Sequence, residues 1–225
     1  MARFDVVTFD CYGTLIDWET GIREAFRRRA TDDGVRVSPV DVLRAYGEVE
    51  REVEAEGYRS YRAVLRLTAR RVAARFDWRL DEEHADLLSE SLPTWRPFPD
   101  TNAALKKLAA AGCRVGILSN VDDDLLGETR RYFDVPFDLL VTAQQVRSYK
   151  PAEGHFEAAR RKIGSDLRWV HAAQSYFHDV VPCKRLGIPV AWINRKGEKA
   201  GDAGPPDREF PDLARFAVWA TSAPG

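Results

Sequence analysis

Five short apolar runs are spaced along the 225-residue chain, and each is bounded by turn-forming or polar residues. Runs that are short and apolar on both faces are typical of strands buried in a parallel sheet. Strands are therefore expected at residues 4–9, 114–118, 137–141, 169–172 and 190–193.

Stretches with helical spacing of apolar residues lie between these runs. They predict helices at residues 100–111, 122–132, 151–163 and 178–186. Gly112, Gly164 and Gly187 stand where C-terminal helix caps are expected. Pro151 suits a first helical turn. Because strands and helices alternate, the pattern predicts an α/β fold with a doubly wound parallel sheet.

One long segment, residues 16–97, breaks the alternation. It is rich in Arg, Glu and Ala, has apolar pairs at helical spacing such as Val49 and Val53, and offers no convincing strand. Two domains are therefore expected, a core made of residues 1–15 and 98–225 and a helical domain made of residues 16–97.

The C-terminal part of the chain carries weaker signals. Residues 197–207, "GEKAGDAGPPD", have the composition of a loop. Residues 210–220, "FPDLARFAVWA", predict a final short helix on the sheet.

Charge and cysteine content narrow the range of partners. The chain has 34 basic and 35 acidic residues, which argues against nucleic acid or an anionic membrane as the main partner. Its three cysteines are far apart, so neither a disulfide framework nor a zinc site is indicated. No signal-type segment or long apolar run is visible, and a cytoplasmic protein is expected.

Polar side chains gather at the ends of the predicted strands. In an open α/β sheet, ligands bind beyond the carboxyl ends of the strands. That rule selects residues 10–14, Ser119 with Asn120, Lys150, and residues 174–179. A single polar residue at a strand end is usually a loop start or a helix cap. Four consecutive strands with such groups indicate a shared site instead.

Four segments carry a resemblance to a known family. "DCYGTL" at 10–15, "ILSN" at 117–120, "YKP" at 149–151 and "QSYFHD" at 174–179, the last followed by "WINR" at 192–195, resemble the ordered motifs of the haloacid dehalogenase superfamily. The helical insertion resembles the cap domain of that superfamily. The resemblance implies a Rossmann-like core, a helical cap and a covalent aspartyl intermediate.

Two positions separate this chain from the magnesium-dependent phosphatases of that superfamily. Tyr12 stands where their first motif has a second acid, and Gln174 stands where their fourth motif has an acid. Mg²⁺ prefers several carboxylate or phosphate oxygens, so a tight metal site is not expected. D-x-Y-G-T-L instead resembles the 2-haloacid dehalogenase branch, which uses no metal; no cofactor is expected. A halide leaves as a stable anion, so an acid at position 12 has no task.

The resemblance assigns the reaction to three residues. Asp10 would displace the halide at C2 of a small carboxylate substrate, and water would then hydrolyse the ester. Lys150 would pair with Asp10 and bind the substrate carboxylate or offset developing charge. Asp179 would orient Lys150 or activate the water.

Other motif residues are expected to contact the substrate. Thr14 and Ser119 would hold its carboxylate, together with the backbone N–H groups of Cys11 and Tyr12. Asn120 would face the leaving group.

The fourth motif departs from the dehalogenase pattern, S-S-N-A-W-D. Ser175, Tyr176 and His178 are the expected substrate contacts there, but Tyr176 replaces an asparagine and His178 a tryptophan. Phe156 replaces a tyrosine of the third motif. His178 would suit a smaller, more polar site for haloacetates including fluoroacetate; the alternative is a helix N-terminal residue without a role in binding.

The helical domain has no secure counterpart of the arginine that clamps substrate in that branch. Arg44 is the best candidate by placement, with Arg51 and Arg59 nearly as good, and surface charge is the alternative for each. Among the other histidines, His171 is expected as a satisfied core residue, and His84 and His155 as structural or exposed residues.

Three rival functions stay open. They are a magnesium-dependent phosphatase, an aspartyl hydrolase acting on another activated bond such as C–N, and a non-catalytic binding protein. Because homodimers are common in the family, the sequence also leaves a homodimer open.

Overall fold

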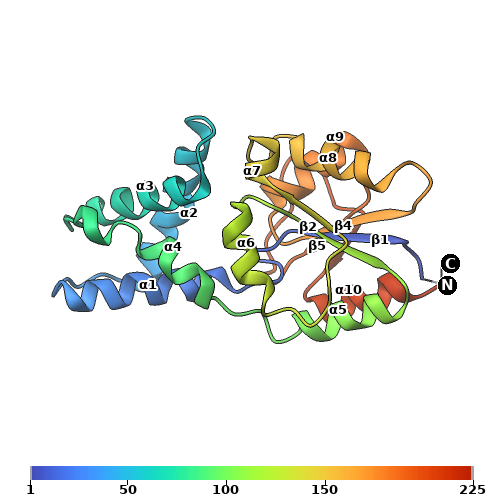
Figure 1. Cartoon of the computed structure of the whole chain (residues 1–225), viewed down its shortest axis with the longest axis horizontal. Helices are drawn as coiled ribbons and strands as arrows, with labels where there is room; N and C mark the ends of the chain where they lie inside the picture. The colour runs from blue at the N-terminus through green and yellow to red at the C-terminus, as the bar shows by residue number, and fades with distance from the viewer. Residues whose placement is uncertain (1, 224–225) are drawn as a thin grey trace. The chain divides into compact units, whose positions relative to one another are not determined.

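The computed structural model describes residues 2–223 (Figure 1). Contacts divide the chain into two compact units. The sheet unit contains the N-terminal segment to Ile16, Pro97–Asn120 and the segment from Arg131 onward. The helical unit contains Asp17–Arg96 and Val121–Arg130.

The sheet unit is built on six parallel strands in the order β3-β2-β1-β4-β5-β6. This arrangement confirms the predicted doubly wound α/β fold. The strands are β1 Val6–Phe9, β2 Arg114–Ser119, β3 Leu139–Thr142, β4 Trp169–Ala173, β5 Val190–Ile193 and β6 Arg208–Phe210.

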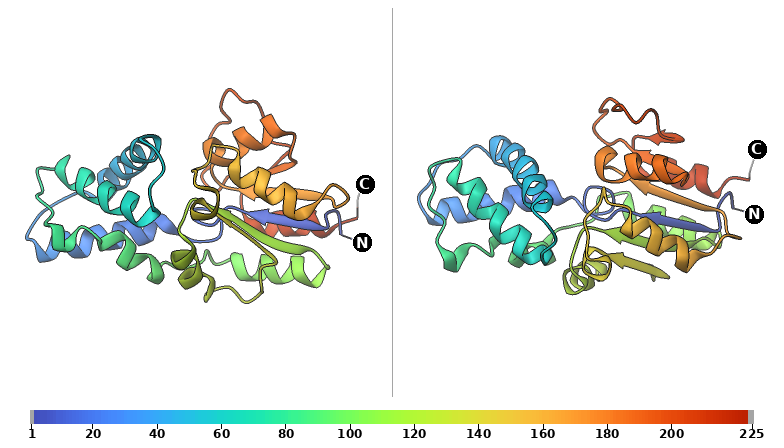
Figure 2. Two further views of the ribbon diagram at one scale, coloured as in Figure 1. Left: turned by 45° about the horizontal axis from the view of Figure 1, so that its top comes forward. Right: turned by 90° about the horizontal axis from the view of Figure 1, so that it is seen from above.

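Helices cover both faces of the sheet. Helices α5 (Thr101–Ala110) and α10 (Leu213–Thr221) pack side by side on one face, whereas α8 (Gly154–Ile163) and α9 (Val181–Leu186) cover the other (Figures 1 and 2). The apolar face of α8 explains its position, since Phe156, Ala159 and Ile163 are buried in one cluster with strand residues.

Strand β1 lies in the middle of the sheet, where both of its faces are covered. All four of its residues, "VVTF", are buried. A short, uniformly buried and mainly apolar strand is typical of the centre of a parallel sheet. This position places the residue that follows it, Asp10, at the centre of the carboxyl edge.

Three local predictions differ from the structure. Helix α8 begins at Gly154 rather than at Pro151, because residues 149–152 form a turn closed by the Ala152 N–H and the Tyr149 carbonyl at 3.0 Å. The predicted helix at 178–186 is a π-helical turn, Tyr176–Val180, followed by α9. Strand β6 and the short helix α7 (Ala143–Val146) were not predicted, since neither has a clear apolar pattern.

The helical unit contains no strand in its described residues, as the sequence pattern predicts. Its α-helices are α1 Trp18–Asp32, α2 Pro39–Ala55, α3 Tyr61–Ala74, α4 Leu87–Ser91 and α6 Asp123–Arg130. Short 3₁₀ turns lie at Glu82–His84 and Leu92–Thr94. Side chains of Asp17, Ser38 and Ser60 cap the first three helices by accepting backbone N–H groups.

The boundary residues of the two units lie close to those expected from the sequence, with one further segment. Residues 121–130 group with the helical unit, because the Asp122 carboxylate accepts the backbone N–H groups of Tyr61 and Arg62 at 2.9 and 3.0 Å. Whether these units are separate domains stays a prediction. Within residues 2–223, no helix has the length and apolar character needed to cross a bilayer.

Close packing at Gly21 in α1 provides a stability test for the helical unit. A Cβ at this position would lie 2.3 Å from the Trp95 ring, whereas a Cβ at Gly47 in α2 would meet nothing within 4 Å. We expect Gly21→Ala to lower the free energy of unfolding by about 1–3 kcal/mol, because the buried ring must move. Gly47→Ala, the matched control, should raise it by about 0.5–1 kcal/mol. Urea unfolding measures both changes; equal effects would contradict the packing described.

Candidate active site

The turn after β1 presents Asp10 at the carboxyl edge of the sheet. Gly13 has a φ of 102°, a conformation that L side chains rarely adopt, and its N–H donates to the Ile16 carbonyl. The Thr14 hydroxyl donates to Asp10 Oδ2, just beyond the end of β1, at 2.9 Å. The same hydroxyl accepts the Gln174 N–H at 2.8 Å, so Thr14 fixes the Asp10 carboxylate.

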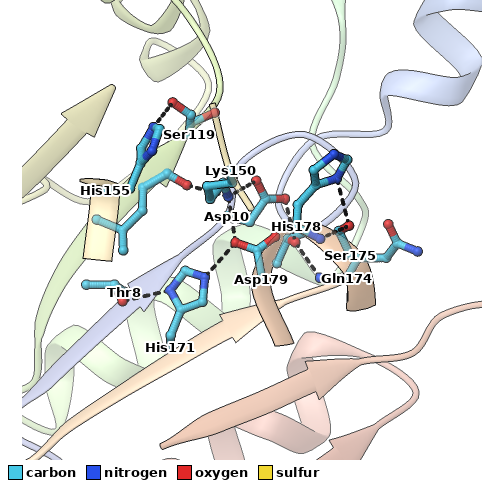
Figure 3. A network of polar contacts seen from close by, with 12 residues as sticks. Thr8, Asp10, Ser119, Lys150, His155, His171, Gln174, Ser175, His178 and Asp179 are labelled. Carbon is cyan, nitrogen blue, oxygen red and sulfur yellow. Dashed lines mark hydrogen bonds and ion pairs between the residues drawn. The ribbon is translucent and has the colours of Figure 1, made fainter. Parts of the chain in front are cut away.

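Lys150 joins two carboxylates at this edge (Figure 3). Its ammonium donates to Asp10 Oδ1 at 3.0 Å, to Asp179 Oδ1 at 2.6 Å and to the Leu118 carbonyl at 2.9 Å. An ammonium group has three N–H donors, and these three acceptors use all of them. Lys150 is 1% exposed and Asp10 is 7% exposed, so the network is nearly dry.

Burial and pairing act in opposite directions on these groups. Burial would lower the pKa of Lys150, but Asp10 and Asp179 raise it above its ordinary value, and the lysine stays cationic. Burial would raise the pKa of Asp179, but the Lys150 charge and a hydrogen bond from His171 hold it at about 2. Burial raises the pKa of Asp10, with Asp179 adding to the effect and Lys150 and Thr14 partly offsetting it.

Asn120 supports the backbone of Lys150. Its Oδ1 accepts the Lys150 N–H at 2.8 Å and its Nδ2 donates to the Lys150 carbonyl at 3.1 Å. Asn120 thus supports the turn that carries Lys150, and its predicted contact with the leaving group stays a prediction.

Ser119, the last residue of β2, lies beside His155 of α8. The Ser119 hydroxyl is buried and has no hydrogen-bond partner among the described residues. Its carbonyl lies 3.1 Å from Nε2 of His155, which is buried in α8. Burial lowers the pKa of His155 to about 3, so the ring is neutral and its Nε2–H donates to the carbonyl. Ser119 is therefore held by its backbone and retains a hydroxyl for a ligand.

The π-helical turn Tyr176–Val180 carries the fourth motif. Ser175 caps it, because its Oγ accepts the His178 N–H at 3.1 Å and lies 3.0 Å from the His178 ring nitrogen Nδ1. The turn places Asp179 in the interior beside Lys150, while His178 stays half-buried at the edge. Single π-helical turns are frequent at functional sites.

Tyr176 was predicted to contact the substrate, and that contact stays a prediction; the contacts that the structure shows are with the protein itself. Its hydroxyl oxygen lies 2.6 Å from the Gly204 carbonyl and 3.0 Å from the Gly201 carbonyl, so its one proton is shared between these two acceptors. Its ring packs edge-on against Trp192. Tyr176 therefore anchors the loop at 197–207 through groups that the sequence pattern did not reveal.

Arg44 was the sequence-based candidate for a substrate clamp. It lies in α2, is 68% exposed at its side chain and pairs with Asp41 one turn away. This is a surface ion pair and does not support Arg44 as a substrate contact. The alternatives are also engaged locally, Arg51 by the Gly47 carbonyl and Arg59 by Glu56.

Sequence reasoning missed a hydrogen-bonded cluster in the helical unit. Glu50 Oε1 accepts the hydroxyls of Tyr46 and Tyr61 at 2.5 and 2.6 Å. Burial raises the pKa of Glu50, although both hydroxyls favour its charged form. The spacing of Tyr46 and Glu50, four residues apart on one helix, was the available signal.

Cys11 and Tyr12 complete the turn after β1. Cys11 is fully buried, its carbonyl accepts the N–H groups of Leu15 and Ile16, and burial raises the pKa of its thiol well above the ordinary value. Their predicted contacts with substrate through backbone N–H groups stay a prediction.

The donor set at this edge is that of an ion-pair network. Among residues 2–223, no group of three or more His, Cys, Asp or Glu side chains is arranged to hold a metal ion. The two carboxylates that meet here, those of Asp10 and Asp179, share the Lys150 ammonium.

Comparison with known proteins gives consistent relatives. Residues 4–174 match the family model of the haloacid dehalogenase-like hydrolases. The chain is 24% identical to (S)-2-haloacid dehalogenase H-109 from Pseudomonas putida, covering 97% of this chain and 99% of the relative. It is 25% identical to haloacetate dehalogenase H-2 from Moraxella sp. (strain B), covering 88% of each. The crystal structure of a defluorinating L-2-haloacid dehalogenase has the same fold, with a TM-score of 0.83 at 21% identity over 97% of this chain and 96% of that one.

Proposed function

Because the chain belongs to the haloacid dehalogenase-like hydrolases, we propose that it is a metal-independent hydrolase that displaces halide from a small 2-halocarboxylate. The observation that carries the proposal is the buried Asp10–Lys150–Asp179 network, with Tyr12 where a leaving-group acid would stand. Relatives named as dehalogenases of 2-haloacids and haloacetate support this substrate class.

In the first step an Asp10 carboxylate oxygen attacks C2 of the substrate. The C–O bond forms as the C–X bond breaks, and the halide leaves with the bonding electron pair, so no proton is required. Lys150 keeps Asp10 ionised against the desolvation that raises its pKa. Thr14 donates to Oδ2 and thereby fixes the carboxylate orientation.

In the second step water attacks the ester carbonyl carbon of Asp10. Asp179 takes a proton from that water and returns it to the leaving alkoxide oxygen as the bond between the Asp10 carbonyl carbon and that oxygen breaks. The 2-hydroxy acid is released, and Asp10, which gives its remaining proton to solvent, is again a carboxylate. The two oxygens of Asp179 suit separate tasks. Oδ1 accepts from Lys150 and His171, whereas Oδ2 is buried without a hydrogen-bond partner among the described residues and can accept from water.

Substrate binding relies on groups of the sheet edge. The Ser119 hydroxyl is a buried donor suited to the substrate carboxylate. His178 can donate to a carboxylate or a fluoride from the half-buried turn that carries it.

A halide-release assay tests the proposal. With EDTA present, we expect halide release from at least one of fluoro-, chloro- and bromoacetate or the two 2-chloropropionate enantiomers. p-Nitrophenyl phosphate with and without Mg²⁺ is the comparison substrate. Mg²⁺-dependent phosphate release without halide release would instead support the phosphatase alternative. No turnover of any substrate would favour hydrolysis of another C–X bond.

A further inference from the structure

Three buried side chains form a hydrogen-bonded series that ends at the Asp179 carboxylate. Trp169 Nε1 lies 2.8 Å from Thr8 Oγ1, Thr8 Oγ1 lies 2.8 Å from His171 Nδ1, and His171 Nε2 lies 3.0 Å from Asp179 Oδ1. Figure 3 shows the last two contacts between the strands and the site. Neither step of the proposed reaction requires a bond to be made or broken at any of these three side chains.

The pairing of β1 with β4 explains why these three side chains meet. Thr8 and His171 are register partners on the neighbouring parallel strands β1 and β4. Trp169 and His171 are two residues apart on β4 and therefore face the same side of the sheet. Thr8 and His171 are fully buried and Trp169 is largely buried, so water competes little for the hydrogen bonds of Thr8 and His171.

Trp169 at one end of this hydrogen-bonded series and Asp179 at the other determine the direction of each hydrogen bond. An indole N–H can only donate, so Thr8 Oγ1 accepts from Trp169. Asp179 is ionised beside the Lys150 ammonium and can only accept, so His171 Nε2 must carry a proton. The Thr8 hydroxyl proton and the bare His171 Nδ1 remain, and these two match.

Other protonation states of His171 fit less well. In an imidazolium, Nδ1–H would donate to Thr8, and the Thr8 hydroxyl proton would have no acceptor among the described residues. In the neutral Nδ1–H tautomer, the Nε2 lone pair would face the Asp179 carboxylate. Each alternative leaves a buried polar group unsatisfied, which is unfavourable.

We propose that Trp169, Thr8 and His171 are positioning residues that hold His171 as a neutral Nε2–H donor and thereby orient the Asp179 carboxylate for water activation. The lone pair of His171 faces Thr8, away from the carboxylate, so His171 is not the base. The hydrogen bond to Oδ1 sets the rotation of the carboxylate and leaves Oδ2 for the water. The kinetic part of this proposal rests on the proposed function; the tautomer does not.

The charged surroundings of Asp179 agree with this role. The titratable groups that face it are Lys150 from the turn before α8, Asp10 from the end of β1, His155 from α8, His171 from β4 and Cys183 from α9. The hydrogen bond from His171 is one of the contributions that keep the pKa of Asp179 low. Without this bond the pKa of the Asp179 carboxyl rises. The acid limb of the pH–rate profile for ester hydrolysis should therefore move to higher pH.

Nitrogen-15 NMR of histidine-labelled protein tests the tautomer directly. The chain has four histidines, and the spectrum of His171→Gln identifies the His171 signals by their loss. We expect a protonated Nε2 and a bare Nδ1 at neutral pH. An imidazolium, or the reverse tautomer, would overturn the proposal, whatever reaction the protein catalyses.

Step-resolved kinetics with chloroacetate tests the positioning role. His171→Leu should slow ester hydrolysis on the order of 10- to 100-fold, because the carboxylate loses its orientation, while the first halide burst stays nearly unchanged. The Asp10 ester should then accumulate and be visible in the mass of the intact protein. His171→Gln, whose amide N–H can still donate to Oδ1, should restore hydrolysis. His84→Gln in the helical unit is the matched control and should change neither step.

Equal rates in His171→Leu and His171→Gln, or equal slowing of both steps, would overturn the positioning role. If His171→Leu does not fold, Thr8→Val and Thr8→Ser replace it. Thr8→Val should slow ester hydrolysis and populate the other His171 tautomer, because Nδ1 loses its hydrogen-bond donor, whereas Thr8→Ser should do neither. If the native protein releases no halide from any substrate, the proposed function fails, and the NMR result alone decides the tautomer.

Discussion

Asp10→Asn is expected to lower kcat for halide release by at least about four orders of magnitude, which is the scale seen when a catalytic nucleophile is removed. An amide oxygen is a poor nucleophile and cannot form the ester at a useful rate. The change is nearly isosteric, the Asn oxygen can still accept from Lys150, and its NH₂ group can donate to the Thr14 hydroxyl oxygen, so the fold should persist. Halide release under saturating substrate measures the loss.

The matched control for Asp10→Asn is Asp5→Asn. Asp5 lies just before β1 and pairs with Arg168, so it has a similar local position without a place in the network. The control should keep near-native kcat. Full turnover by Asp10→Asn would refute the assignment of the nucleophile.

Lys150→Met is expected to have the largest effect on stability. Removing one partner of a buried ion pair leaves uncompensated charge and typically costs about 3–5 kcal/mol. Here two buried carboxylates lose their shared cation. Urea unfolding near neutral pH measures the loss, and halide release should fall with it.

The pH dependence of this loss distinguishes charge from packing. Without Lys150, burial raises the pKa of both carboxyl groups above their unfolded values, so the penalty is present at neutral pH. It should shrink as acid protonates Asp10 and Asp179. Native Asp179, with its pKa near 2, shows the opposite sign and loses its stabilising contribution only as pH falls through that value.

Lys184→Met is the control for the lysine substitution. Lys184 pairs with Asp207 at 3.2 Å, but both side chains are partly exposed. An ion pair of this kind contributes about 0–1 kcal/mol, so a small change without a strong pH dependence is expected. A comparable loss in both variants would contradict the buried-network account.

The sequence predicted the centre of the site because topology alone brings it together. Asp10, Lys150 and Asp179 follow different strands, and the carboxyl ends of parallel strands meet at one edge. The buried runs and the glycine caps were sufficient to locate the five longest strands. Gly112, Gly164 and Gly187 all have positive φ at helix ends, as expected.

Side-chain direction is what the sequence could not supply. Tyr176 and Asn120 stand in the expected motifs, yet each forms its hydrogen bonds with backbone distant in sequence, at Gly201 and Gly204 and at Lys150. A motif position predicts where a Cα lies. The hydrogen-bond partner of its side chain depends on the path of nearby loops, which have no periodic sequence pattern.

His171 illustrates a partly correct prediction. It is a satisfied core histidine, as expected, but one of its partners is Asp179. Its contact with Thr8 depends on the register between β1 and β4, which requires the paired sheet. The spacing of Trp169 and His171 on one strand face was the available signal.

A single turnover in H₂¹⁸O, with enzyme in excess over chloroacetate, tests the covalent mechanism most directly. If Asp10 displaces the halide and water attacks the Asp10 carbonyl, the hydroxyl oxygen of the product comes from Asp10. We expect ¹⁸O in the peptide that contains Asp10 and unlabelled glycolate. Labelled glycolate from the first turnover, with no ¹⁸O in Asp10, would show direct attack of water on carbon and contradict the account.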